Sequence, residues 1–201
     1  MNKKGLPYHP EMKLIPFDAI AKIKSKEEIA KEMVKEYCIA HKALNKIQGI
    51  SDSKDTEFVT TVLKYQPDQE LLKILSEISK GEVNSVALNE LAYLFERVNV
   101  YMWILGLGYK PLQNKQCFVY GLAMQISKYN NIDELINNCK MISNEEIMEY
   151  ADLMTRYEWA MIELNNKGEK SKNINNDSVI EQKRAMDWVT FFNPDNLLKQ
   201  E

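Results

Sequence analysis

Hydrophobic residues along this chain recur at intervals of three and four positions, and this spacing limits the possible folds more than any other feature. Such intervals place apolar side chains on one face of an α-helix, whereas a half-buried β-strand needs alternation at every second position. The 201 residues include 7 glycines and 6 prolines, too few for the many turns that a protein of short strands requires. The pattern therefore predicts an all-α protein.

The length of 201 residues suits a single globular helical domain of about seven or eight helices. We expect residues 1–16 to form a flexible basic arm and residues 17–201 to form the domain. Several of the expected helices have an apolar stripe or a start or stop signal, and the segments are residues 25–48, 56–65, 67–80, 84–107, 115–129, 132–139, 143–166 and 177–192. The segment over residues 84–107 becomes apolar on nearly all sides, so we expect it at the centre.

Capping residues support several of these boundaries. Ser143 and Glu146 have the spacing of a capping box, in which each side chain accepts a hydrogen bond from the other residue's backbone N–H. Gly81 is a suitable stop for the helix before it, because glycine adopts the left-handed conformation without strain. We expect Asp177 or Ser178 to cap the last helix.

Composition and charge exclude several classes of protein. The formal net charge of −3 provides no basic excess, so we predict no nucleic-acid partner. The longest apolar run, residues 98–108, is far shorter than the ~20 residues of a membrane span, so we predict no membrane association. No apolar segment follows the N-terminal lysines, and the cysteines Cys38, Cys117 and Cys139 lie far apart in the sequence. Both features are typical of a cytoplasmic protein with reduced thiols.

The chain has no motif typical of nucleophilic or metal catalysis. Cys38 and His41 have the spacing of a zinc-binding pair, but structural zinc needs four ligands and no second Cys/His cluster exists. Glu145, Glu146 and Glu149 could hold Mg²⁺, yet acidic residues in a first helical turn more often stabilise the helix dipole. We therefore predict no metal, no cofactor and no catalytic residue.

Two segments near the C-terminus place charged residues and a tryptophan on one helix face. At 3.6 residues per turn, the members of each set lie within about 60° of one another. The sets are Asp152, Arg156 and Trp159 in the first segment and Glu181, Arg184 and Trp188 in the second. Charged residues are rarely buried unless they are paired, so the pattern indicates either an internal ion-pair network or a ligand site.

We favour the ion-pair network, in which an acid of one helix binds an arginine of the other. Asp152 is the expected partner of Arg184, and replacing Arg184 should then strand a buried carboxylate at a cost of about 3–5 kcal/mol. The alternative is that arginines beside tryptophan rings hold an anionic or planar ligand. The candidate residues for either role are Arg97, Trp103, Asp152, Arg156, Tyr157, Trp159, Glu181, Arg184 and Trp188.

Several short segments resemble a known family in their order and approximate spacing. The segments are Lys24-Ser25-Lys-Glu-Glu28-Ile29-Ala30, Arg97 with Trp103-Ile104-Leu105-Gly106, Asp152-x-x-x-Arg156-Tyr157-x-Trp159-Ala160, and Val179-Ile180-Glu181-Gln-Lys-Arg184-Ala185-x-x-Trp188. Over about residues 23–189 the chain is similar to a bacterial family, domain of unknown function 4272. Lys24 and Ile104 depart from the family pattern, which has Arg and Ala at these positions. The resemblance implies a helical fold and does not imply an activity.

The sequence favours a non-enzymatic cytoplasmic protein that binds another protein. Acidic residues strongly outnumber basic ones in residues 144–164, which predicts an acidic helix face suited to a partner with a basic surface. Immunity proteins that neutralise nuclease toxins use this electrostatic attraction and provide an analogy. The alternative function is that of a small-molecule binding protein or an enzyme, with its site at the arginine–tryptophan residues. No oligomeric state is predicted.

Overall fold

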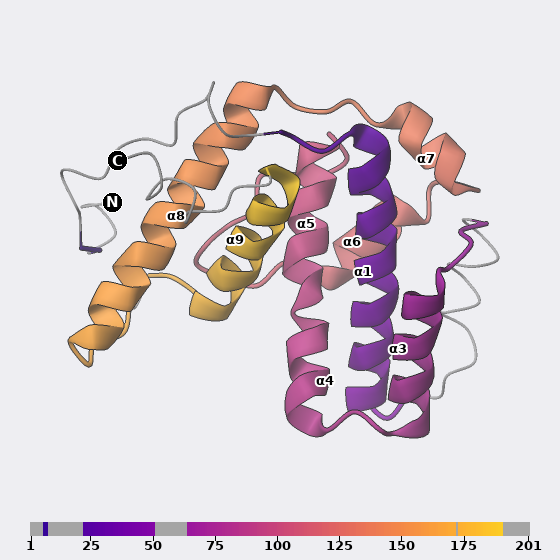
Figure 1. The fold of residues 1–201 in the computed structure, drawn as a ribbon, viewed down its shortest axis with the longest axis horizontal. Coiled ribbons are helices and arrows are strands. Elements are labelled where there is room, and N and C mark those ends of the chain that lie inside the picture. The colour runs from indigo at the N-terminus through magenta and orange to yellow at the C-terminus, as the bar shows by residue number, and fades with distance from the viewer. Residues whose placement is uncertain (1–5, 8–21, 51–63, 172, 191–201) are drawn as a thin grey trace. The chain divides into compact units, whose positions relative to one another are not determined.

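All regular secondary structure in the described part of the chain is α-helical (Figure 1). The computed structural model describes residues 6–7, 22–50, 64–171 and 173–190. The prediction of an all-α fold is therefore confirmed. The chain divides into two compact units, which we call the α1 unit (residues 26–111 and 117–141) and the α8 unit (residues 1–25, 112–116 and 142–201).

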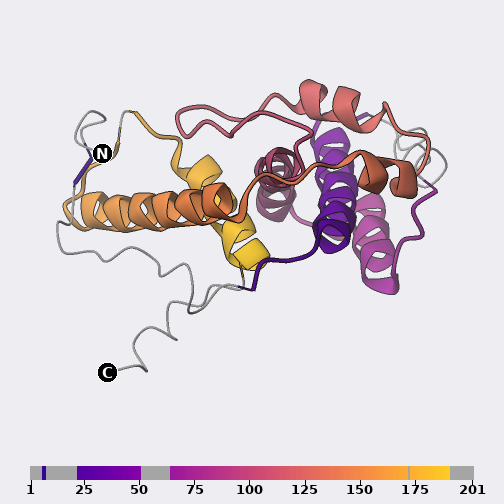
Figure 2. The same cartoon turned by 90° about the horizontal axis from the view of Figure 1, so that it is seen from above.

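The α1 unit is built around its first helix, which buries side chains along its whole length. Its helices are α1 (Lys26–Ile47), α3 (Gln69–Lys80), α4 (Ser85–Ala92), α5 (Leu94–Ile104), α6 (Val119–Ile126) and α7 (Ile132–Asn138). Helix α1 packs against α3, α4, α5 and α7, and Figure 2 shows it between α5 and α3. The second half of the segment over residues 84–107, which we expected at the centre, is α5, and nine of its 11 residues are buried.

The segment over residues 84–107 forms two helices instead of the single helix that we predicted. The break lies at Tyr93, whose N–H donates to Asn89 O and Glu90 O, while Glu96 N–H donates to Tyr93 O at 2.9 Å. The bonds from Tyr93 to Glu90 and from Glu96 to Tyr93 span three residues instead of four, and they tighten the turn between α4 and α5. Hydrophobic periodicity does not report such a change, since the apolar stripe continues through the tighter turn.

The turn after α5 lies directly against the segment after α7. Lys140 N–H donates to Leu105 O at 3.0 Å, and Gly106 has a φ of +71°. A Cβ atom at Gly106 would lie 2.2 Å from Lys140 O, so only glycine fits between the two backbones. Gly106, which follows the end of α5, therefore also provides a close contact between distant segments of the chain.

Helix α6 begins at Val119, four residues later than the predicted start at Lys115. The buried carboxylate of Glu96 on α5 accepts a hydrogen bond from Cys117 N–H at 2.7 Å, which holds this segment out of the helix. Phe118 follows with an extended ψ of 91°. The prediction failed because the competing bond comes from a residue that is distant in the sequence.

The α8 unit contains two long helices that pack on each other, α8 (Asn144–Asn166) and α9 (Asn176–Thr190). Ser143 and Glu146 form the predicted capping box at the start of α8. The cap of α9 differs from the prediction, because Asn175 Oδ1 accepts a hydrogen bond from Ser178 N–H at 3.1 Å. Asn175 thus takes the role that we expected of Asp177 or Ser178.

Three of the sequence-based expectations fall on residues that are largely or wholly outside the described ranges. The structure describes the basic arm over residues 1–16 only at Leu6 and Pro7. It describes the predicted helix over residues 56–65 only at residues 64 and 65, and neither of these is helical. The predicted end of the last helix at Phe192 lies outside the described residues.

Candidate functional site

Asp152 and Arg156 form an ion pair within α8. Arg156 Nε donates to Asp152 Oδ2 at 2.6 Å, and Arg156 Nη2 lies 3.3 Å from Asp152 Oδ1. Both side chains are 15% exposed, so the guanidinium is shielded from water and held by a carboxylate one helical turn away. Such a two-point contact is among the stronger arrangements for an arginine and a carboxylate. It uses both carboxylate oxygens of Asp152.

Arg184 pairs with Glu181 on its own helix, three residues away. The predicted bridge from Arg184 to Asp152 across the two helices is therefore wrong. Arg184 is 59% exposed, whereas Glu181 is 10% exposed. Residues three and four apart on a helix are already neighbours, so each arginine binds an acid one turn away on its own helix.

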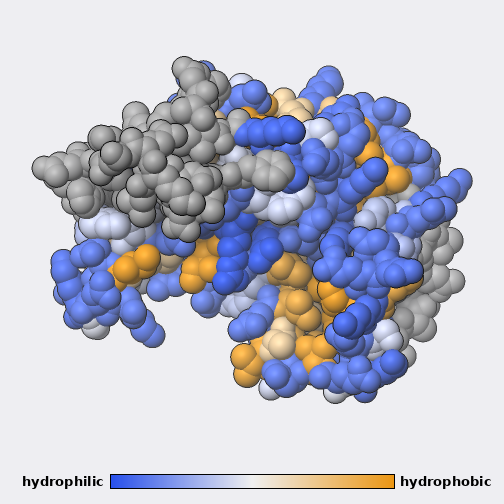
Figure 3. All heavy atoms as spheres, in the orientation of Figure 1, coloured by the Kyte–Doolittle hydropathy of each residue, from blue (hydrophilic) through white to orange (hydrophobic). Residues whose placement is uncertain are grey.

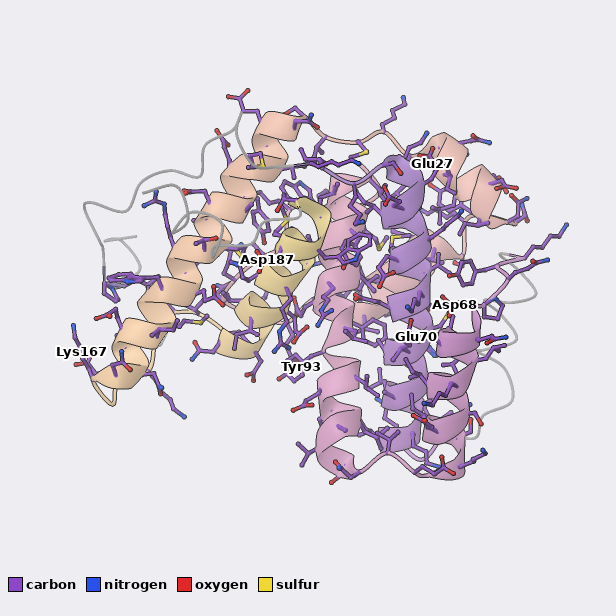
Figure 4. All side chains as sticks on the ribbon, viewed as in Figure 1. Glu27, Asp68, Glu70, Tyr93, Lys167 and Asp187 are labelled. Carbon is purple, nitrogen blue, oxygen red and sulfur yellow. The ribbon has the colours of Figure 1, made fainter. Side chains whose placement is uncertain are left out.

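The ion pair that joins α8 to α9 uses Lys183, a residue that our sequence-based reasoning missed. Lys183 Nζ lies 2.6 Å from both carboxylate oxygens of Asp187 and 3.5 Å from Glu158 Oε2 on α8 (Asp187 is labelled in Figure 4). The Lys183 side chain is only 5% exposed. Its position between the buried residues Val179 and Met186 on α9 could have indicated this burial.

Burial also affects the carboxyl group that holds Lys183. The pKa of Asp187 is raised above its usual value, because burial disfavours the charged carboxylate more than the hydrogen bond and charge of Lys183 favour it. The ammonium and carboxylate therefore stabilise each other in a place where either charge alone would be costly. This arrangement is typical of a structural contact between two helices.

A buried polar network connects α8, α9 and the segment over residues 112–116. Tyr150 Oη donates to Gln182 Oε1 at 2.9 Å, and Gln182 Nε2 donates to Leu112 O at 3.1 Å. Asn175 N–H donates to Gln113 O at 2.7 Å, which attaches the start of α9 to the same segment. Because buried polar groups are costly unless they are hydrogen-bonded, these contacts fix the segment in one position.

The aromatic candidates of the α8 unit have different surroundings. Tyr157 is 4% exposed and belongs to the core. Trp159 and Trp188 are half-buried, and Lys24 Nζ lies 4.9 Å from the centre of the Trp188 ring. The backbone of Lys24 also donates to Val189 O at 2.9 Å. Trp188 is thus part of the contact between the end of α9 and the segment before α1.

Arg97 and Trp103 lie on α5 and belong to the α1 unit. Arg97 Nη1 donates to Glu36 Oε1 on α1 at 3.1 Å, and Glu36 is a buried residue that we did not predict as a partner. Lys110 Nζ lies 5.2 Å from the centre of the Trp103 ring. The contact with Arg97 compensates the charge of Glu36, which is buried between α1 and the largely apolar α5.

The cysteines are poor nucleophiles in this structure. Burial raises the pKa of Cys38 to about 12 and that of Cys139 to about 11. Burial and the nearby Glu96 carboxylate also raise the pKa of Cys117. Thiolates react whereas thiols do not, so these groups are protonated and unreactive near neutral pH.

Two kinds of feature are absent from the described residues. No set of three or more His, Cys, Asp or Glu side chains among them is arranged to hold a metal ion. No helix in the same ranges has both the length and the apolar character needed to cross a membrane.

The outward stripe of α8 is rich in carboxylates. At 3.6 residues per turn, one side of this helix carries both the Asp152–Arg156 pair and further acids. The acids on this side are Glu145, Glu149, Asp152 and Glu163. Glu145 and Glu149 are exposed. Because Asp152 neutralises Arg156, the exposed acids determine the charge that this part of the helix presents.

The family described as Domain of unknown function (DUF4272) matches residues 1–196. The chain belongs to this family, as its sequence resemblance indicated. No curated protein and no solved structure matches the chain.

Proposed function

We propose that this chain is a non-enzymatic protein that binds a partner protein with a basic surface, through the exposed acids of α8. The observation that carries the proposal is the exposure of Glu145 and Glu149 on a helix whose arginine is already paired with Asp152. An approaching cationic surface therefore meets carboxylates that are not neutralised by Arg156. Such a surface accelerates association with a basic partner and disfavours acidic ones.

The alternative function, binding of a small anionic ligand or catalysis at the arginine–tryptophan residues, receives less support. Arg156 and Arg184 each have a carboxylate within their own helix. An anion would have to compete with these carboxylates for the guanidinium groups. The raised pKa values of the three cysteines also give no support to a thiol nucleophile.

We further propose a bacterial, cytoplasmic setting. The bacterial source follows from the family resemblance, and the cytoplasmic location is supported by the thiols. Cys38, Cys117 and Cys139 are all free in the structure. Free thiols are typical of the reducing cytoplasm, whereas proteins of oxidising compartments usually form disulfides.

Reversing the charge of the α8 face should reduce partner binding. We expect Glu145→Lys with Glu149→Lys to lower capture of a basic protein from host lysate by at least about tenfold, because repulsion replaces attraction. Capture is measured by quantitative mass spectrometry at low and high salt. The matched control, Glu82→Lys with Glu90→Lys, makes the same charge change at exposed residues around α4 and should bind normally.

The proposal has two clear requirements. The protein recovered by the wild type and by the control variant must be basic, and its capture must weaken as salt screens the charges. Equal recovery of every protein by the two double variants would contradict the role of α8.

Arg184→Met should leave stability nearly unchanged, in contrast to the sequence-based expectation. The Arg184 side chain is 59% exposed, so water can take the place of its guanidinium beside Glu181, which is 10% exposed, and we expect a loss of at most about 1 kcal/mol. Lys183→Met, at the neighbouring buried position, should lower the free energy of unfolding by about 2 kcal/mol, because it leaves Asp187 without its ammonium. Urea unfolding followed by circular dichroism measures both. A larger loss for Arg184→Met than for Lys183→Met would contradict the assignment of the helix-joining ion pair.

A further inference from the structure

Helix α6 exposes large apolar side chains on the side that faces away from its own unit. Leu122 and Ile126 are buried, whereas Tyr120 is 66% exposed and Met124 is 52% exposed. Figure 2 shows α6 at the edge of the α1 unit, beside α1 and α5. Aromatic residues and methionine are enriched at protein interfaces. By comparison, most of the surface in the view of Figure 3 is hydrophilic.

The N-terminal end of this face is an aromatic surface. Phe118 is 73% exposed, and its ring centre lies 6.0 Å from that of Tyr120. A Cβ atom at Gly121 would lie 2.9 Å from Phe118 Cδ1, so the glycine allows the ring to lie close to the helix. Two exposed rings therefore stand together where α6 begins.

The C-terminal end of the same face carries a positive charge. Lys128 follows α6 and is exposed, with its Nζ 2.6 Å from Gln125 Oε1. The sequence has no Asp or Glu from Arg97 to Ile132, so α6 and its flanking residues offer no carboxylate to Lys128 within this stretch. The face thus has aromatic rings at one end and a cation at the other, and these two groups attract each other.

Tyr120, Met124 and Lys128 are spaced by four residues, which makes the face complementary to a second copy of itself. Positions four apart on a helix differ by about 40°, so Tyr120 and Met124 lie on one side of α6, and Lys128 follows in the turn that continues from its C-terminal end, where its N–H donates to Gln125 O. If two α6 helices meet antiparallel with Met124 at the twofold axis, each Tyr120 lies opposite the partner's Lys128. The two methionines then meet at the centre.

We propose that a second copy of this chain docks on the α6 face in this symmetric antiparallel arrangement. Twofold dimers with one self-complementary surface are the commonest oligomers of soluble proteins. The α6 helix spans only about 12 Å, so the contact area is small and the association weak, with a dissociation constant on the order of 10–100 µM.

Analytical ultracentrifugation of the full chain tests the proposal. Over about 5–300 µM, the mean mass of the wild type should rise from 23.4 kDa towards twice that value. Met124→Glu should keep the chain monomeric, since it places two carboxylates against each other at the axis. Val86→Glu is the matched control, because Val86 is 67% exposed on α4 and lies outside the α6 face. The control should associate like the wild type, and circular dichroism confirms that all variants are folded.

A charge exchange tests the predicted register. Tyr120→Lys should weaken the association by at least about tenfold, because two lysines then face each other twice across the axis. Adding Lys128→Glu to Tyr120→Lys should restore it, because each new lysine then faces a carboxylate of the partner.

Three results would overturn the proposal. A wild type that stays monomeric up to 300 µM would leave the α6 face to a different protein or to a nucleic acid. Association that survives Met124→Glu would place the interface elsewhere, and failure of the charge exchange to restore association would exclude the antiparallel register.

Discussion

Replacing Gly106 with alanine should lower the free energy of unfolding by about 3–5 kcal/mol, a larger loss than we expect from breaking the Lys183–Asp187 ion pair. Two costs combine at this position. The φ of +71° is unfavourable for any residue with a Cβ atom, and that atom would lie 2.2 Å from Lys140 O. The clash involves backbone on both sides, and the hydrogen bond from Lys140 N–H to Leu105 O holds the two segments together. Neither segment can move away without breaking this contact.

Gly168→Ala is the matched control for the backbone conformation. Gly168 has a φ of +69°, but a Cβ atom there would have no neighbour within 4 Å. Its replacement should cost only the conformational strain, about 1 kcal/mol. The difference between the two variants, measured by urea unfolding, isolates the effect of the close approach. Equal losses for Gly106→Ala and Gly168→Ala would mean that the contact with Lys140 contributes nothing.

Arg97→Met should lower the free energy of unfolding by about 3 kcal/mol, because it leaves a buried carboxylate without its guanidinium. Glu36 is 7% exposed at its side chain and lies 3.1 Å from Arg97 Nη1, which joins α1 to α5. The double variant with Arg97→Met and Glu36→Leu should recover most of the loss, since well-packed apolar residues can replace a buried ion pair. A double-mutant cycle by urea unfolding measures the coupling.

Two outcomes would contradict this account of Arg97. A small effect of Arg97→Met alone would show that Glu36 does not depend on the arginine. A double variant no more stable than the single one would show that the loss came from packing of the arginine side chain and not from the stranded charge. Because Arg97 was a candidate site residue, a stability effect of this size would support a structural role.

Residue spacing in the sequence predicted a helix end correctly where the capping hydrogen bonds join residues that are close in the sequence. The αL conformation of Gly81 after α3 and the capping box of Ser143 and Glu146 before α8 both appeared as predicted. These features depend on hydrogen bonds between residues three to five positions apart, so they can be recognised from spacing alone.

Boundaries that depend on distant residues were not predictable in this way. The start of α6 is delayed because the Glu96 carboxylate on α5 binds Cys117 N–H. At the start of α9, Asn175 provides the cap, and its own N–H is held by Gln113 O from the segment over residues 112–116. Spacing within the helix cannot reveal a partner that folding brings from elsewhere in the chain.

The candidate site residues show the same difference between features that the sequence predicts and contacts that depend on the packing of helices. The sequence by itself determined the all-α class, most helix positions, the family, and which charged and aromatic residues share a helix face, because these follow from periodicity and motif order. Only the tertiary structure decided that Arg156 and Arg184 pair within their own helices, that Lys183 joins α8 to α9, and that Arg97 binds Glu36. Periodicity defines the face on which a charge lies, whereas its partner is determined by which helices pack together and how deeply each side chain is buried.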